Sequence, residues 1–235
     1  MLQNILFDLD GTLTNPEKGI TTGVQLALRR FGIEENDPDR LRAFIGPPLW
    51  AMFREQYGLS DEEAGRAVGY YREYYVDTGL FENFVYPGVP ELLDRLRQDG
   101  RRLWVATSKP TVMAERVLRH FGLDASFERI CGIGLNDADK SKSDVIADVL
   151  TDFELTPAET VMAGDRKYDI EGGRANGLRT VGVTWGFGSV AELLLSGATA
   201  LAQDPASLPE ILAWWEAHPN GEPFQPPAGF PPFMG

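Results

Sequence analysis

The chain has 235 residues, enough for one compact domain or for a main domain with a smaller second one. Hydrophobic residues make up 43% of it and charged residues 24%, which is ordinary for a globular protein and excludes wholesale disorder, and no apolar run reaches the roughly 18–20 residues that a membrane helix needs. The 35 acidic and 22 basic residues give a net charge of −13, which favours solubility and argues against nucleic acid or an anionic membrane as a partner.

The first predicted element is a short buried strand at residues 4–7. Its sequence, Asn-Ile-Leu-Phe, is a brief apolar run that ends in acidic residues, as in strands of a parallel sheet. No basic segment with a long apolar core precedes it, so we expect no secretory signal and a cytoplasmic location.

A helical stretch follows, over residues 16–83. Apolar residues recur at helical spacing over residues 20–31 and 49–57, and a capping-box sequence at residues 60–63 opens a third helix. No convincing strand interrupts this stretch. We therefore predict a small helical bundle inserted after the first strand, and call it the helical insertion.

Strands and helices alternate from Pro87 onward. The pattern predicts strands at residues 102–107, 129–133, 160–164 and 179–184, with helices at residues 89–96, 110–121, 143–153 and 168–176. Such alternation predicts an α/β fold, a doubly wound parallel sheet with helices on both faces. We expect a core domain of residues 1–15 and 84–218, the helical insertion at residues 16–83 over the carboxyl edge of the sheet, and a poorly ordered or extended Pro- and Gly-rich tail at residues 219–235.

Two aspartates, Asp8 and Asp10, follow the first strand in the sequence Asp-Leu-Asp-Gly-Thr. In an extended chain their side chains point the same way, so two carboxylates would share one small volume, which is costly unless a proton or a cation offsets them. A plain turn explains the same residues, since Asp and Gly are common turn formers. Their position favours a site, because ligands bind at the carboxyl ends of the strands in a doubly wound sheet.

Polar residues also follow the later strands. They are hydroxyl, basic and acidic residues in turn: Thr107 and Ser108, then Lys140 and Lys142, then Asp165 and Asp169. Singly, each is explained by a helix cap or a solvated surface charge, although hydroxyls and backbone amides at a strand-to-helix turn can also cradle an anion. Four polar strand ends in this order are better explained by one site.

The side chains available for a metal are oxygen ligands. Cys131 is the single cysteine, and His120 and His218 lie far apart in the sequence, which excludes a disulfide framework and argues against zinc. Clustered carboxylates favour a hard cation, and we predict Mg²⁺ as the cofactor.

These motifs, in this order, resemble those of the haloacid dehalogenase superfamily of phosphohydrolases over roughly residues 5–215. Residues 8–12 match its DxDGT motif and Thr107 its hydroxyl motif, Lys142 matches its lysine motif with Lys140 as the alternative, and residues 164–169 match GDxxxD. The helical insertion resembles the cap domain of that superfamily, on its Rossmann-like core. The segments FIGPPL (44–49), GLFEN (79–83), ATSKP (106–110) and GDRKYD (164–169) are similar to the phosphoglycolate phosphatase-like branch, some members of which are 5′-nucleotidases.

The resemblance implies a role for each matched residue. Asp8 would be the nucleophile that forms an aspartyl-phosphate, and Asp10 would protonate the leaving oxygen and then activate water. Mg²⁺ would bind the Asp8 side chain, the Asp10 backbone carbonyl and the Asp165 carboxylate, with Asp169 acting from outside this ligand set. Three further residues would hold the phosphoryl group and assist its transfer: Thr107, Ser108 and Lys142.

The expected function is therefore Mg²⁺-dependent hydrolysis of small phosphorylated metabolites, as in phosphoglycolate phosphatases, with a 5′-nucleotidase as the alternative. Other functions on the same scaffold fit less well. Asp10 argues against a dehalogenase, in which the second acid would not be expected. A sugar-phosphate mutase would use a cap histidine, and both histidines lie outside residues 16–83. A non-catalytic binding protein would be expected to lack a matched residue, and none is missing.

The helical insertion should contribute the residues that face the substrate, for which Arg42, Pro47 and Pro48 are the candidates. Phosphoglycolate would need a tight cap with a cationic contact, whereas a nucleotide would need a wider cleft and an aromatic platform. Three aromatic residues are available for such a platform, although we favour the core of the insertion as their place: Trp50, Phe53 and Tyr57.

Overall fold

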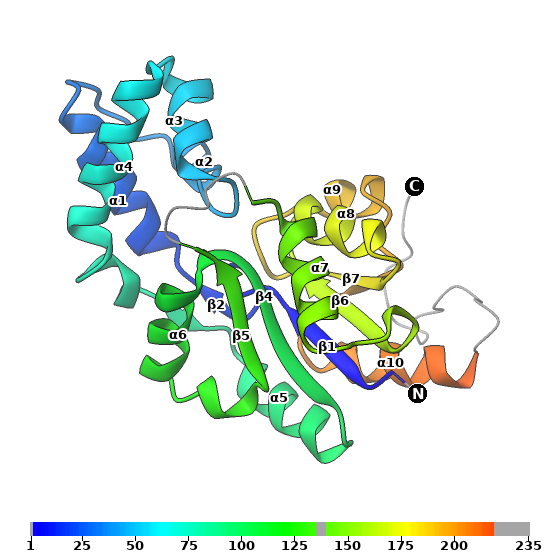
Figure 1. Cartoon of the computed structure of the whole chain (residues 1–235). Coiled ribbons are helices and arrows are strands. Elements are labelled where there is room, and N and C mark those ends of the chain that lie inside the picture. Colours follow the sequence, from blue (N-terminus) through cyan, green and yellow to red (C-terminus); the bar gives the residue numbers. More distant parts are fainter. Residues whose placement is uncertain (1, 135–139, 219–235) are drawn as a thin grey trace.

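The computed structural model describes residues 2–134 and 140–218. A six-stranded sheet runs through its centre in the order β5-β4-β1-β6-β7-β8, and all neighbouring strands are parallel (Figure 1). Its strands are β1 (Asn4–Phe7), β4 (Arg102–Pro110), β5 (Arg129–Ile133), β6 (Thr160–Gly164), β7 (Arg179–Val183) and β8 (Ala200–Ala202). The strand order reverses between β1 and β6, and the carboxyl ends of strands at such a point are where ligands bind.

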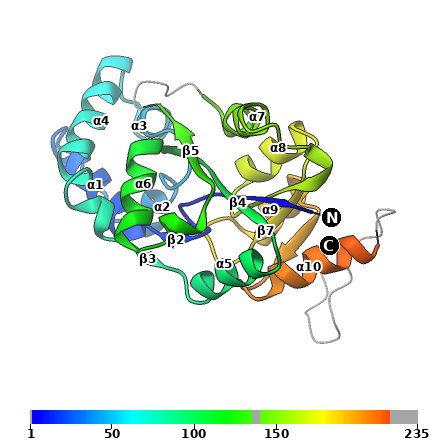
Figure 2. The same ribbon diagram turned by 60° about the horizontal axis from the view of Figure 1, so that its bottom comes forward.

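Helices cover both faces of the sheet (Figure 2). One face carries α5 (Val89–Gln98), α6 (Thr111–His120) and α10 (Ser207–Ala217), and the other carries α7 (Lys142–Asp152), α8 (Lys167–Ala175) and α9 (Val190–Leu195). The apolar run of β1 serves both layers, since Ile5 and Phe7 belong to the cluster that includes α5, whereas Leu6 belongs to the cluster that includes α7. This alternation is what a strand buried on both faces requires. The predicted doubly wound α/β fold is confirmed.

The helical insertion follows β1 and lies beyond one end of the sheet (Figure 1). Its helices are α1 (Glu17–Arg29), α2 (Pro38–Arg42), α3 (Leu49–Tyr57) and α4 (Asp61–Tyr75), followed by a 3₁₀ turn at Gly79–Phe81. A short antiparallel pair of strands, β2 (Thr14–Asn15) and β3 (Phe84–Val85), lies where the insertion leaves and rejoins the sheet. The domain limits expected at residues 15–16 and 83–84 stay a prediction.

Local capping chemistry sets the start of two helices that matter for the site. Ser60 Oγ accepts from the Glu63 backbone N–H while the Glu63 carboxylate accepts from the Ser60 N–H, which opens α4 as the sequence predicts. Ser141 and Asp144 form the same reciprocal pair at the start of α7. Lys142 is therefore the first residue of α7, next to the carboxyl edge of the sheet.

The structure differs from the sequence prediction at two places. β4 extends to Pro110, whereas the pattern predicted a helix from that residue, because the strand pairs again with Ile133 after a shift of register that follows Ala106. The chain after Thr184 adds β8, α9 and α10, which the alternation pattern did not predict. The predicted Pro- and Gly-rich tail, residues 219–235, lies outside the described residues. Among the described helices, none has both the length and the apolar character that crossing a bilayer requires.

Candidate active site

The site begins at the carboxyl end of β1. Asp8 follows Phe7 directly, and its backbone N–H donates to the Ala163 carbonyl at 3.0 Å, so this residue is still held against β6. The chain then turns sharply, with the Thr12, Leu13 and Thr14 N–H groups all donating to the Leu9 carbonyl. As the alternation in an extended chain suggested, both Asp8 and Asp10 line one cleft.

Three acidic residues from two neighbouring strand ends meet at one buried point. Carboxylate oxygens of Asp8, Asp165 and Asp169 all lie within 4.8 Å of one another, and all three residues are buried. Asp8 follows β1, whereas Asp165 follows β6 and Asp169 lies in the first turn of α8. The adjacency of these two strands in the sheet therefore brings together acids that lie more than 150 positions apart in the chain.

Lys142 provides a cation in this acidic cluster. Its Nζ lies 2.7 Å from Asp8 Oδ1 and 2.9 Å from Asp169 Oδ1, and it also donates to the Ala106 carbonyl at 3.0 Å. Burial lowers the pKa of Lys142, but Asp169 and Asp8 outweigh burial and the pKa is raised, so the ammonium stays charged. Lys140, the alternative from the sequence, lines the cleft but pairs with Asp148.

Asp165 is held from two sides. Thr12 Oγ1 donates to its Oδ1 at 3.2 Å, and the Phe187 backbone N–H donates to its Oδ2 at 2.8 Å. Gly186 packs so closely that a Cβ atom there would lie 2.3 Å from the Cβ of Asp165. Sequence reasoning gave no role to the segment after β7, because its role depends on this spatial contact.

The electrostatics of the cluster fit a divalent cation. Burial, together with the neighbouring carboxylates of Asp169 and Asp8, raises the pKa of Asp165 well above its usual range. The acids therefore outnumber the cations that the described side chains supply at this point. Oxygen donors favour a hard ion such as Mg²⁺, which would neutralise them. The residues present thus fit the metal expected from the sequence.

Thr107 and Ser108 lie beside this cluster at the end of β4, and both line the cleft. Thr107 is buried, and its Oγ1 accepts from the Lys109 N–H at 3.2 Å. The structure therefore brings Thr107 and Ser108 to the same edge of the sheet as the acids and Lys142.

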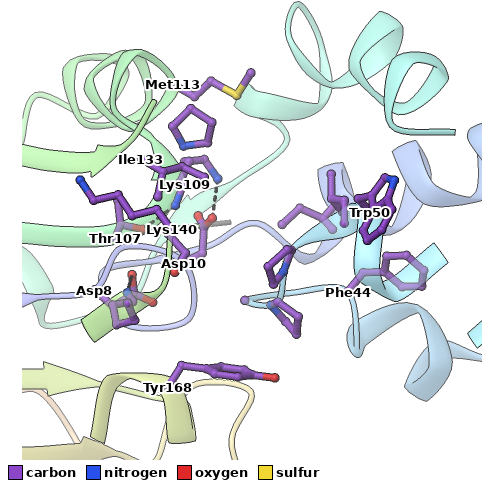
Figure 3. A pocket seen from close by; sticks show the side chains of 18 of the residues that line it. Asp8, Asp10, Phe44, Trp50, Thr107, Lys109, Met113, Ile133, Lys140 and Tyr168 are labelled. Carbon is purple, nitrogen blue, oxygen red and sulfur yellow. Dashed lines mark hydrogen bonds and ion pairs between the residues drawn. The ribbon is translucent and has the colours of Figure 1, made fainter. Parts of the chain in front are cut away.

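One charged residue at the same edge was given no role from the sequence. Lys109 is buried, and its Nζ donates to Asp10 Oδ2 (Figure 3). It also donates, at 2.8 Å, to the hydroxyl of Tyr75 in α4. Burial raises the pKa of Asp10 by more than the neighbouring Lys109 lowers it, so this pKa lies above its usual value. The sequence did contain one indication of its position. Alternate residues of an extended strand point to the same side, which places Lys109 on the same side as Thr107.

The cleft in front of these residues has a volume of about 380 Å³. Figure 3 shows Phe44 and Trp50 of the helical insertion across the cleft from Asp8 and Asp10. Further apolar and aromatic residues of the wall include Ile20, Leu49, Val68, Tyr71, Tyr75, Met113, Ile133 and Tyr168. Arg72 also lines the cleft and was not predicted from the sequence.

The candidates for substrate contact divide into two groups. Pro47, Pro48 and Trp50 line the cleft, whereas Phe53 and Tyr57 do not: Phe53 is fully buried in the core, and Tyr57 donates to Glu35 at 3.0 Å. The expectation for Arg42 was wrong. Its guanidinium is exposed and pairs with Glu17 at 2.6 Å and Asp39 at 3.2 Å, so neighbouring acids already bind it away from the cleft.

Arg166 connects the core to the helical insertion. Its Nη1 donates to the Ile45 carbonyl at 2.7 Å, and its Nε donates to Glu192 at 2.9 Å. Ile45 belongs to the FIGPPL segment, whose two prolines line the cleft. A residue that follows the acid of the GDxxxD motif thus fixes one wall of the cleft.

Known proteins are similar to this chain both in sequence and in architecture. The sequence matches the haloacid dehalogenase-like hydrolases over residues 5–183. A 5′-nucleotidase of Pseudomonas aeruginosa is 46% identical over 209 residues, which cover 89% of this chain and 95% of that protein. A phosphoglycolate phosphatase of Aquifex aeolicus is 30% identical over 186 residues, which cover 78% of this chain and 85% of that protein. The crystal structure of a predicted phosphatase from Clostridium acetobutylicum has a TM-score of 0.87 and 41% identity, covering 91% of this chain and 99% of that one.

The chain belongs to the haloacid dehalogenase-like hydrolases. Within that family it is a phosphatase, an enzyme of the phosphoric monoester hydrolase class. The resemblance that the motifs indicated is confirmed at this level.

Proposed function

We propose that this enzyme is a Mg²⁺-dependent phosphomonoesterase that works through an aspartyl-phosphate on Asp8. The observation that carries the proposal is the convergence of Asp8, Asp165 and Asp169 beside Lys142, at the wall of an open cleft. An anionic phosphoryl group needs positive charge in such an acidic pocket, and a charged lysine with a divalent cation supplies it.

The residues that would hold Mg²⁺ are Asp8 and Asp165, together with the Asp10 backbone carbonyl. Asp169 would act from outside the ligand set, as the motif resemblance implies. One of its oxygens binds Lys142 and the other accepts from the Arg166 N–H at 3.0 Å. When bound, Mg²⁺ supplies positive charge that offsets the acids and the charge that develops on the transferred phosphoryl group.

The protein's own residues carry the two chemical steps. A carboxylate oxygen of Asp8 attacks phosphorus, the bond from phosphorus to the ester oxygen breaks, and Asp10 gives its proton to that oxygen. Water then attacks phosphorus, Asp10 takes a proton from it, and the bond between phosphorus and the Asp8 oxygen breaks. Inorganic phosphate leaves with Asp8 regenerated. The buried Oδ1 of Asp10 has no hydrogen-bond partner in the described part of the chain, so it is available for these transfers.

For the substrate we propose a nucleoside monophosphate ahead of phosphoglycolate. A cleft of about 380 Å³ with aromatic and apolar walls suits a leaving group with a flat, weakly polar surface, and a glycolate group would leave most of that wall without contact. The Pseudomonas aeruginosa relative is a 5′-nucleotidase, which supports this choice. We place the reaction in the cytoplasm, on a small phosphorylated metabolite.

A kinetic panel tests the proposal. Phosphate release is measured for nucleoside 5′-monophosphates, phosphoglycolate and sugar phosphates, with Mg²⁺ and with a chelator, for the wild type, Asp8→Asn and Asp94→Asn. Asp94 is an exposed aspartate of α5 and serves as the matched control. We expect Mg²⁺-dependent release with the highest kcat/KM for nucleotides, full activity in Asp94→Asn and none in Asp8→Asn. Turnover by Asp8→Asn contradicts the nucleophile, and a higher kcat/KM for phosphoglycolate contradicts the substrate class.

A further inference from the structure

We propose that Lys109 is a positioning residue that aligns Asp10 for proton transfer, and that Tyr75 of the helical insertion holds Lys109 in place. The inference rests on the proposed function, in which Asp10 is the group that protonates the leaving oxygen.

The two carboxylate oxygens of Asp10 differ in their contacts. Lys109 Nζ binds Oδ2, whereas Oδ1 is buried and has no hydrogen-bond partner among the described residues. An ion pair on one oxygen restricts rotation of the carboxyl group. The second oxygen is thereby kept for the ester oxygen and, later, for water.

The backbone that carries Lys109 also carries the predicted phosphoryl-binding residues. β4 runs through Thr107, Ser108 and Lys109 to Pro110, and the Lys109 N–H donates to Thr107 Oγ1 at 3.2 Å. The same strand end therefore sets the place of the phosphoryl group and the place of the cation that binds Asp10. This arrangement fixes the proton donor relative to the bond that breaks.

Tyr75 links this arrangement to the helical insertion. It is the last residue of α4, it is buried, and its hydroxyl accepts from Lys109 Nζ at 2.8 Å. Its ring stacks on Tyr71 with 4.8 Å between centroids, so its position depends on the packing of α4. Lys109 thus has its full set of partners when α4 lies against the core. Leaving-group protonation is coupled in this way to the placement of the insertion.

The chemistry provides a readout that a purely structural role would not change. An alkoxide leaving group, such as the 5′-oxygen of a nucleoside, is strongly basic and needs a proton as it departs. A 4-nitrophenolate leaving group is a stable anion and departs with little help. Misalignment of Asp10 should therefore slow an alkyl ester more than a 4-nitrophenyl ester.

The experiment compares kcat/KM for a nucleoside 5′-monophosphate and for 4-nitrophenyl phosphate, with Mg²⁺, in the wild type and in variants. The variants are Lys109→Gln, Lys109→Arg and Tyr75→Phe, with Lys167→Gln as the control, since Lys167 is an exposed lysine near the same edge. Inhibition by inorganic phosphate reports whether the phosphoryl site stays intact in each variant.

We expect Lys109→Gln to lose at least about tenfold more kcat/KM on the nucleotide than on the 4-nitrophenyl ester. Lys109→Arg should recover part of that ratio, Tyr75→Phe should move it in the same direction by less, and Lys167→Gln should leave it unchanged. Equal losses on both esters, or no loss, overturn the inference while the proposed function stands. If Lys109→Gln fails to fold, the ratio in Tyr75→Phe and Lys109→Arg decides. A wild type that hydrolyses neither ester overturns the proposed function and the inference together.

Discussion

Lys142 donates a hydrogen bond of 2.7 Å to Asp8, although 134 positions separate the two residues in the chain. The contact arises because α7 begins at the carboxyl edge of the sheet, immediately after the capping box at Ser141. The same ammonium group binds Asp169, so one lysine offsets acids from two strand ends. Removing it would leave both carboxylates buried without their cation, which is costly.

Replacing Lys142 should therefore affect both stability and activity. We expect Lys142→Met to lower the free energy of unfolding by about 3 kcal/mol in the absence of Mg²⁺ and to abolish phosphate release. Lys140→Met is the matched control, because the side chains of Lys140 and Asp148 are 29% and 53% exposed and such pairs contribute at most about 1 kcal/mol. Urea denaturation and phosphate release measure the two effects. Equal changes in the two variants would show that Lys142 is not the lysine of the site.

The stabilisation of the fold by Mg²⁺ should depend on pH, and the raised pKa of Asp165 determines whether it grows or shrinks as the pH rises. Burial and the neighbouring acids raise the pKa of Asp165, so without metal its contribution to stability is present at low pH and is lost as the pH rises through the raised pKa. Mg²⁺ binds the ionised acids and competes with these protons. The rise in Tm on adding saturating Mg²⁺ should thus be larger at about pH 8 than at about pH 5. Thermal unfolding at both pH values checks this. The same rise at both, or its persistence in Asp165→Asn, speaks against a metal at these acids.

The wall of the cleft should depend on Arg166. Arg166→Ala removes the hydrogen bond to the Ile45 carbonyl and the ion pair with Glu192, so the segment that contains Pro47 and Pro48 loses its contact with the core. We expect KM for a nucleoside monophosphate to rise about tenfold, with a smaller change in kcat. Lys167→Ala, at the exposed neighbouring position, controls for loss of a positive charge. A loss of kcat with unchanged KM would instead place Arg166 in the chemistry.

Local patterns made much of the fold and the acidic cluster predictable. The apolar run of β1, the capping box at Ser60 and the alternation of strands with helices each depend on residues close together in the chain. Because parallel strands share one carboxyl edge, that alternation also predicts that Asp8, Thr107 and Asp165 meet. The order of the strands was not needed for this prediction, although the order is what makes β1 and β6 neighbours.

Other features depend on contacts between distant segments, which a local pattern does not contain. Lys109 meets Asp10 across 99 positions and Tyr75 across 34. The ATSKP segment alone places Lys109 on the same side as Thr107, but it does not identify these two partners. Arg42 is the opposite case, because the sequence made it a candidate for substrate contact and the structure places it elsewhere. Its acidic partner Glu17 lies 25 positions away, on another helix.

Gly186 should be essential for the metal site because it packs against Asp165. A Cβ atom on Gly186 would lie 2.3 Å from the Asp165 Cβ and 2.3 Å from the Gly11 carbonyl oxygen, so Gly186→Ala must displace the acid or the segment that donates to it. We expect the affinity for Mg²⁺ to fall by about 10–100-fold, which isothermal titration calorimetry measures.

Gly65→Ala provides the control for that glycine. Gly65 lies on the exposed face of α4, and nothing lies within 4 Å of the position that its Cβ would take. A methyl group there favours the helix and should raise the free energy of unfolding by up to about 1 kcal/mol, with the affinity for Mg²⁺ unchanged. Because both substitutions add one methyl group, the difference between them reports the crowding of Asp165 and of the Gly11 carbonyl. An unaltered affinity for Mg²⁺ in folded Gly186→Ala would mean that Asp165 is not positioned by this segment, or that it is not a ligand.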